Sequence, residues 1–165
     1  MEVASINKTH VDIALEKQRR VSEARAILQD LDRLESIPTE KKRRWVWELL
    51  QNAKDCAREN GVSITITLTR DSIVFEHDGS PFDLDSILAL VRRTSTKSYD
   101  NSDGSTGKFG TGFVTTHVLN KVVEVSGLLQ NETGTRPFVL QVDRTANSLE
   151  ALQASLDDAF GEINK

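Results

Sequence analysis

Three polar side chains recur on one face of a predicted helix and could carry chemistry there. Glu48, Asn52 and Asp55 follow one another at spacings of four and three residues. Helix geometry puts such positions on the same side of the cylinder. A carboxylate can orient or deprotonate a water molecule, and an amide oxygen can bind a hard cation such as Mg²⁺. This acidic face either borders solvent or lines a polar cavity within the fold.

A glycine-rich cluster further along the chain could bind phosphate. Its residues are Gly107, Lys108, Phe109, Gly110, Thr111, Gly112 and Phe113. The apolar run that follows can begin a helix. Glycine lets the backbone approach a ligand closely, and the unpaired amides at a helix start suit an anion. The same spacing is found in ordinary turns, and no Gly-Lys-Ser/Thr triplet follows as it would in a Walker A loop.

Two helices are predicted in the first third of the chain. Apolar residues recur at three- and four-residue steps across residues 9–37 and predict a long helix. This helix either packs in the core or serves as a dimerisation or regulatory arm. Pro38 ends it and can begin the next helix, which carries the acidic face and spans residues 39–60. Gly61 is expected to close that second helix.

Strands are expected next. Alternating apolar and polar residues over 62–69 and 72–77 predict an antiparallel hairpin with one polar face. The hairpin leads into Asp78 and Gly79, a turn-forming pair. Asp83 then caps a short helix that runs to residue 91.

A long polar segment separates these elements from the last ones. Residues 92–106 have few apolar anchors and run directly into the glycine cluster, which favours a functional lid. After the helix behind the glycines, strands are expected around 121–126 and 137–142, with a polar loop between them. A final amphipathic helix is predicted over residues 147–160.

Composition excludes several classes of protein. The 165 residues fit one domain, and the net charge of −4 gives no general attraction for nucleic acid or an anionic membrane. No run of about 18 apolar residues is present, and the polar first residues lead us to expect no secretory leader. The single cysteine, Cys56, suits a reducing cytoplasm, and no Cys/His cluster predicts zinc. We therefore expect a cytoplasmic protein that binds neither nucleic acid nor a membrane.

The order of these features resembles the GHKL (Bergerat-fold) ATPase superfamily. The acidic face within residues 48–55 is similar to the family's N-box, and residues 107–113 are similar to its second glycine box. The resemblance covers residues 43–126. It is closest to the N-terminal ATP-binding domain of heat-shock-protein-90-like and sacsin-like ATPases. The implied fold is an α/β (α+β) two-layer sandwich, with a mixed, mostly antiparallel sheet covered by helices on one face.

The resemblance implies ATP and Mg²⁺ as ligands. Its ATP-binding positions are Asn52, Asp55, Asp78, Lys97, Gly107, Lys108, Phe109, Gly110, Thr111, Gly112 and Phe113. Glu48 would activate the attacking water, and Asn52 would also ligate Mg²⁺. Asp78 would accept the exocyclic amine of adenine, and a carboxylate there rejects guanine, which presents a carbonyl. Asp55 would support the adenine side, and Lys97 would approach the nucleotide from the lid.

One departure concerns the first glycine box. The family commonly has Asp-x-Gly-x-Gly, whereas this chain has Asp78, Gly79, Ser80, Pro81 and Phe82 in succession. Some sacsin-like relatives have a similar pattern, which favours that branch. No residue is a clear match for the family's adenine-side threonine.

The expected organisation has three parts. Residues 1–37 form an N-terminal helical arm, residues 38–145 the ATP-binding domain, and residues 146–165 a helix that leads into further parts of a longer protein. The expected function is slow Mg²⁺-dependent ATP hydrolysis, with lid closure coupled to a conformational or assembly change. A protein partner or homodimer would respond through further domains. Two alternatives stay open: an ATP sensor without turnover, and a histidine-kinase-type catalytic domain.

Overall fold

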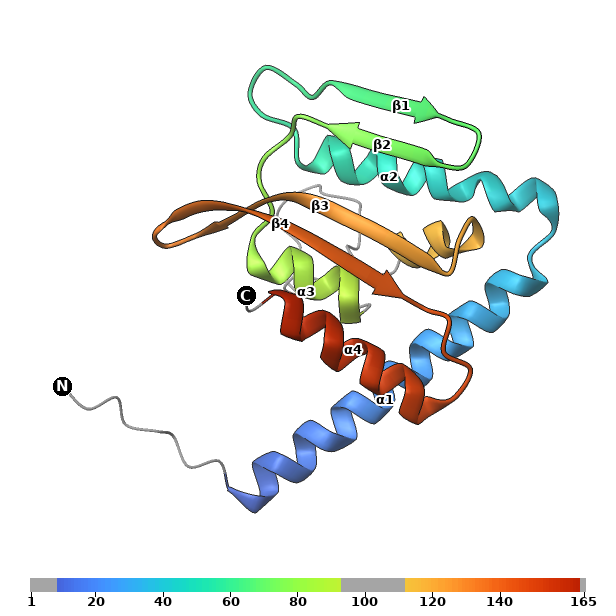
Figure 1. Ribbon diagram of the computed structural model, residues 1–165, viewed down its shortest axis with the longest axis vertical. Coiled ribbons are helices and arrows are strands. Elements are labelled where there is room, and N and C mark those ends of the chain that lie inside the picture. The colour runs from blue at the N-terminus through green and yellow to red at the C-terminus, as the bar shows by residue number, and fades with distance from the viewer. Residues whose placement is uncertain (1–8, 93–111, 164–165) are drawn as a thin grey trace, which may run out of the picture.

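Helices and two antiparallel hairpins form the part of the chain that the computed structural model describes, residues 9–92 and 112–163 (Figure 1). The α-helices are α1 (His10–Ser36), α2 (Arg44–Asp55), α3 (Leu84–Arg92) and α4 (Leu149–Ile163). Two 3-10 helices are η1 (Thr39–Arg43) and η2 (Phe113–Val118). The strands are β1 (Ile64–Leu68), β2 (Ile73–His77), β3 (Val122–Asn131) and β4 (Gly134–Asp143). The expected mixture of α and β structure is confirmed.

The strands form two separate two-stranded sheets, β1–β2 and β3–β4, both antiparallel. The two sheets are linked at Phe82, which follows the first hairpin and makes a parallel bridge with Leu129 of β3. The amide of Phe82 donates to the carbonyl of Leu128 at 2.8 Å, and the amide of Gln130 donates to the carbonyl of Phe82 at 2.7 Å. Phe82 therefore connects the segment carrying Asp78 to the second hairpin.

The core lies between the second hairpin and three of the α-helices. Leu140 and Val142 alternate with exposed residues on β4 and are 1% exposed. They pack with buried residues of α3 and α4, which cover the same side of the hairpin (Figure 1). Ile27 and other residues of the second half of α1 join the same cluster. Burial of these side chains supplies the main stabilising free energy, at about 1.5–3 kcal/mol for each large apolar group.

The first helix agrees closely with its prediction. Thr9 is the N-cap, and its hydroxyl accepts a hydrogen bond from the amide of Asp12 at 3.2 Å. The carboxylate of Asp12 accepts from the amide of Thr9 at 3.0 Å in return, which completes a capping box. The helix ends at Ser36, with Ile37 as C-cap ahead of Pro38. Its first turns reach away from the other helices (Figure 1), and Val11 and Leu15 are exposed there.

The predicted second helix is too long. The chain forms η1 and then α2, which ends at Asp55 with Cys56 as C-cap. Arg58 and Gly61 then exchange backbone hydrogen bonds of 3.2 and 2.8 Å in a tight turn. Gly61 has a φ of +92°. The glycine thus serves this turn, which its positive φ permits, and does not end the helix.

The second hairpin is longer than predicted. Residues 127–136, expected as mostly loop, continue β3 and β4 up to a tight turn. The side chain of Asn131 accepts from the amide of Thr133 at 3.0 Å, and Gly134 has a φ of +134°. The polar residues near this turn lie at the exposed end of the hairpin. They are polar because they face solvent, and the chain is still regular β-strand up to the turn.

Candidate functional site

The acidic face of α2 lies at the boundary between core and solvent. Glu48 and Asn52 are half-buried, and Asp55, the last residue of the helix, is exposed. Ala53 is fully buried, whereas Trp47 is 70% exposed on another side. Glu48 and Asn52 are thus shielded enough to be held in place, yet close enough to the surface to meet a ligand.

Glu48 contacts the last glycine of the glycine cluster. A Cβ atom added to Gly112 would overlap Oε2 of Glu48 and would lie 2.8 Å from its Cδ. Gly112 has a φ of −78°, a value that any residue adopts. The glycine is therefore required here by the close approach of the Glu48 carboxylate, and no left-handed conformation is involved.

The other oxygen of this carboxylate is bound by an arginine. Nε of Arg44 donates a hydrogen bond to Oε1 of Glu48 at 2.8 Å, across one turn of α2. The Arg44 side chain is 74% exposed, and that of Glu48 is 21% exposed. Sequence reasoning missed this contact because Arg44 belongs to a basic run typical of a solvated face. The four-residue Arg-to-Glu spacing is the signal that could have revealed it.

The turn at Asp78 and Gly79 lies against the opposite end of α2. The amide of Ser80 donates to the carbonyl of Cys56 at 2.8 Å. A Cβ atom added to Gly79 would lie only 2.7 Å from that same carbonyl oxygen. Gly79 is thus a glycine because the turn packs directly on the backbone that ends α2.

The carboxylate of Asp78 is oriented by Ser63, the residue just before β1. Its Oδ1 accepts a hydrogen bond from the amide of Ser63 at 2.7 Å, and the amide of Asp78 donates to the carbonyl of Ser63 at 3.3 Å. Nearby, Arg58 donates to the carbonyl of Gly79 at 3.1 Å. Asp78 remains exposed, so its carboxylate is both fixed in direction and open to solvent. Ser63 and Arg58 carried no signal in the sequence, since backbone partners are invisible to motif reading.

The helix behind the glycine cluster differs from the expected one. It is η2, a six-residue 3-10 helix that starts directly after Gly112. The amide and hydroxyl of Thr115 both donate to the carbonyl of Gly112, at 3.0 and 2.7 Å, and tighten this turn. A short 3-10 helix has a smaller dipole than a long α-helix, so less of any phosphate binding can come from the helix terminus.

Phe113 is placed by packing. Its side chain is buried in the core cluster and meets the ring of His117 edge-on, with ring centroids 5.9 Å apart. Only its backbone amide is suited to contact a phosphate. The remaining expected contacts lie outside the described residues: Lys97, Gly107, Lys108, Phe109, Gly110 and Thr111, together with the lid from residue 93 onward.

Burial lowers the pKa values of two histidines near these elements. Burial lowers the pKa of His77, whose Nδ1 accepts a hydrogen bond from the amide of Gly79 at 3.2 Å. Burial, helped by the positive charge of Arg144, lowers the pKa of His117 to about 4. Both rings are therefore neutral at pH 7, and neither is in contact with Glu48 in any recorded hydrogen bond or ion pair of the described residues.

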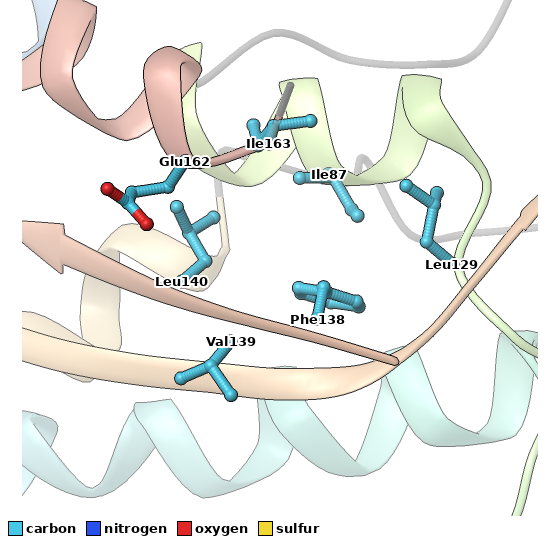
Figure 2. A pocket seen from close by; sticks show the side chains of 7 residues that line it. All are labelled: Ile87, Leu129, Phe138, Val139, Leu140, Glu162 and Ile163. Atoms are coloured by element: carbon cyan, nitrogen blue, oxygen red, sulfur yellow. The ribbon is translucent and has the colours of Figure 1, made fainter. Parts of the chain in front are cut away.

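Two cavities lie away from Glu48, Asn52 and Asp78, and His117 is among the residues that line the larger one. One is a mostly apolar gap of about 10 Å³ between α3, the second hairpin and the end of α4. Figure 2 shows the side chains that line it. Its lining residues are Ile87, Leu129, Phe138, Val139, Leu140, Glu162 and Ile163. This volume is at the lower limit for one water molecule, so the gap is a packing defect. A larger cavity of about 190 Å³ lies between the end of α1, η1 and the loop after η2.

The described residues provide few ligands for a metal ion. They contain no group of three or more His, Cys, Asp or Glu side chains able to hold an ion. A Mg²⁺ ion that arrives with a nucleotide needs few protein ligands, because phosphates and water fill most of its positions. One amide oxygen, that of Asn52, on the half-buried face of α2 fits this kind of binding.

No protein-family model, curated protein or solved structure matches this chain. Within residues 9–92 and 112–163, no helix is long and apolar enough to cross a membrane.

Proposed function

We propose that this chain is a GHKL-type (Bergerat-fold) module that binds ATP with Mg²⁺ and hydrolyses it slowly. In this proposal the two hairpins belong to one mixed, mostly antiparallel sheet joined at Phe82, and helices cover one face of it. The lid, which follows the end of α3 at Arg92 and extends to residue 106, closes over the nucleotide and couples binding to a conformational or assembly change. A protein partner or a second copy in the cytoplasm responds to that change.

The observation that carries the proposal is that two different predicted motifs contact the two ends of α2. Glu48 meets Gly112 near the start of the helix, and the Asp78–Gly79 turn packs on Cys56 at its end. Cys56 comes eight positions after Glu48, which corresponds to about 12 Å along a helix axis. That separation suits an extended nucleoside triphosphate, with the base at one end and the terminal phosphate at the other.

Each residue then has a defined task. The carboxylate of Asp78, held by the amide of Ser63, accepts a hydrogen bond from the amine of adenine. The amides around Gly112 contact phosphate oxygens, and Glu48 orients the attacking water and takes its proton. Asn52 would help to hold Mg²⁺. When bound, the ion would neutralise charge on the phosphates.

Calorimetry and phosphate release test this function on the full chain. We expect ATP to bind with Mg²⁺ present, GTP to bind much more weakly, and phosphate to appear slowly. Glu48→Ala should retain the ATP affinity and lose at least about 99% of the turnover, as expected for loss of a catalytic base. Absence of ATP binding to the wild type would refute the proposal, and unchanged turnover in Glu48→Ala would remove Glu48 from its role.

A second candidate is an ATP sensor without turnover. It is favoured by the hydrogen bond from Arg44 to Glu48, because that bond occupies one oxygen of the only carboxylate assigned to the water. ATP binding with no phosphate release at any protein concentration would support the sensor over the hydrolase.

A further inference from the structure

We infer that Arg44 is a positioning residue for Glu48: it holds one carboxylate oxygen so that the other is presented at Gly112. This inference rests on the proposed ATP hydrolysis and names a residue that neither the N-box pattern nor the glycine pattern includes. Arg44 lies one turn before Glu48 on α2.

The two oxygens of the Glu48 carboxylate have different neighbours. Oε1 accepts the hydrogen bond from Nε of Arg44 at 2.8 Å. Oε2 lies against Gly112, in the space that a Cβ atom there would fill. A glutamate side chain has three rotatable bonds, and contacts on both oxygens define the plane of its carboxylate. Of the two, Oε2 faces Gly112 and is the oxygen assigned here to a water molecule beside a bound phosphate.

The Arg44 side chain is too exposed to contribute much to the stability of the fold, so its effect on the position of Glu48 can be tested separately. The Arg44 side chain is 74% exposed, and ion pairs at such positions contribute little to the stability of a fold. Arg44 is also outside the buried cluster that forms the core. Removing its side chain should therefore leave the fold intact while releasing the carboxylate. Catalysis is sensitive to such release because a small displacement of a reacting group costs much of its rate.

The neighbouring arginine provides a matched control. Arg43 carries the same charge and is exposed, but it is the last residue of η1, five positions before Glu48, and so lacks the four-residue spacing that pairs Arg44 with Glu48. A general effect of positive charge near the site would change both variants, whereas a positioning effect would change only Arg44.

The test compares wild type, Arg44→Gln, Arg44→Lys and Arg43→Gln in kcat, ATP Kd and melting temperature. For Arg44→Gln we expect kcat to fall by about tenfold, the scale of a modest misplacement, with Kd within about twofold because the ground-state contacts remain. Lysine should recover part of the loss through a shorter but still charged donor, and Arg43→Gln should match wild type.

Three results would overturn the inference: an unchanged or higher kcat in Arg44→Gln, an equal loss in Arg43→Gln, or a loss of ATP affinity that accounts for the loss of rate. A wild type that releases no phosphate refutes both the hydrolase and the role of Arg44. A wild type that turns over and an Arg44→Gln variant that matches it refute the role of Arg44 alone.

Discussion

The carboxylate of Glu48 lies against the α-carbon of Gly112, so close that a methyl group on that carbon would overlap Oε2. The two residues are 64 positions apart in the chain. Gly112 is held there because it leads directly into η2, which packs against both α2 and α1. The contact therefore joins the acidic face of α2 to the last glycine of the glycine cluster.

Gly112→Ala should destabilise the protein through this contact. The added methyl group must displace the Glu48 side chain or shift η2, which costs about 1–3 kcal/mol of unfolding free energy on the scale of overpacking. Urea denaturation measures this cost. In a Glu48→Ala background the overlapping atoms are gone, so the same substitution should cost much less.

Gly161→Ala is the control for Gly112→Ala, because a methyl group at Gly161 of α4 meets nothing within 4 Å. Alanine there should stabilise the helix by about 0.5–1 kcal/mol. An equal cost of Gly112→Ala in the presence and absence of the Glu48 side chain would contradict the contact between Glu48 and Gly112.

Asp78→Asn should weaken ATP binding and leave the fold intact. The amide oxygen of asparagine can still accept the hydrogen bond from Ser63, so the turn keeps its shape. The charge-assisted hydrogen bond to adenine is lost, which corresponds to about 1.5–3 kcal/mol, or roughly tenfold to a hundredfold in Kd. Calorimetric titration with ATP measures the change. Asp71→Asn, at the far turn of the same hairpin, should bind like wild type, and an equal affinity in Asp78→Asn would refute the adenine assignment.

Gly79→Ala should weaken the packing of the Asp78 turn against the end of α2. The new Cβ atom would lie 2.7 Å from the carbonyl oxygen of Cys56 and 3.0 Å from its Cβ. Backbone must move to accept it, so we expect a loss of about 1–3 kcal/mol in unfolding free energy. The hydrogen bond from Ser80 to Cys56 should also be lost, which faster amide exchange at Ser80 would report. Wild-type stability and exchange would show that the turn is free to shift.

Local sequence patterns predicted where helices and strands form better than they predicted which side chains are buried. The capping box at Thr9 and Pro38 after the helix bracket α1, so its bounds follow from chemistry within a few residues. The alternation in β1 predicted the strand, but Leu68 is 76% exposed, although its position in the pattern is apolar. Burial depends on what else packs on a strand, and alternation contains no information about that.

The site was predictable only as a set of separate motifs. The spacing within α2 put Glu48 and Asn52 on one face, but their distance to Gly112 depends on how η2 packs against α2. The sequence predicted that the glycines let the backbone approach a ligand, whereas the close approach at Gly112 in the structure is to the carboxylate of Glu48. Arg44 was missed because a four-residue spacing between opposite charges is common on exposed helix faces, and only the structure shows that Arg44 and Glu48 pair. Tertiary contact is the information that local patterns lack.

The buried ring of His117 should make the protein less stable in mild acid. Its pKa is about 4 in the folded chain, compared with an ordinary value of 6.5. Between these values the unfolded chain takes up a proton that the folded chain excludes, so unfolding becomes more favourable as the pH falls. The stabilising contribution is complete above about pH 6.5 and is lost towards pH 4, and it amounts to about 3 kcal/mol in total.

The pH ranges in which two other groups act leave the effect of His117 open to a clear test. Burial also lowers the pKa of His77, which adds a smaller loss in the same direction. The pKa of Asp143 is lowered by hydrogen bonds from Thr145, so its effect falls below about pH 4. His117→Phe keeps a buried ring without a titrating group, and its unfolding free energy, measured in urea, should vary much less between pH 7 and pH 5. His10→Gln, at an exposed site, should retain the wild-type slope. A His117→Phe variant with that same slope would show that the acid sensitivity arises elsewhere.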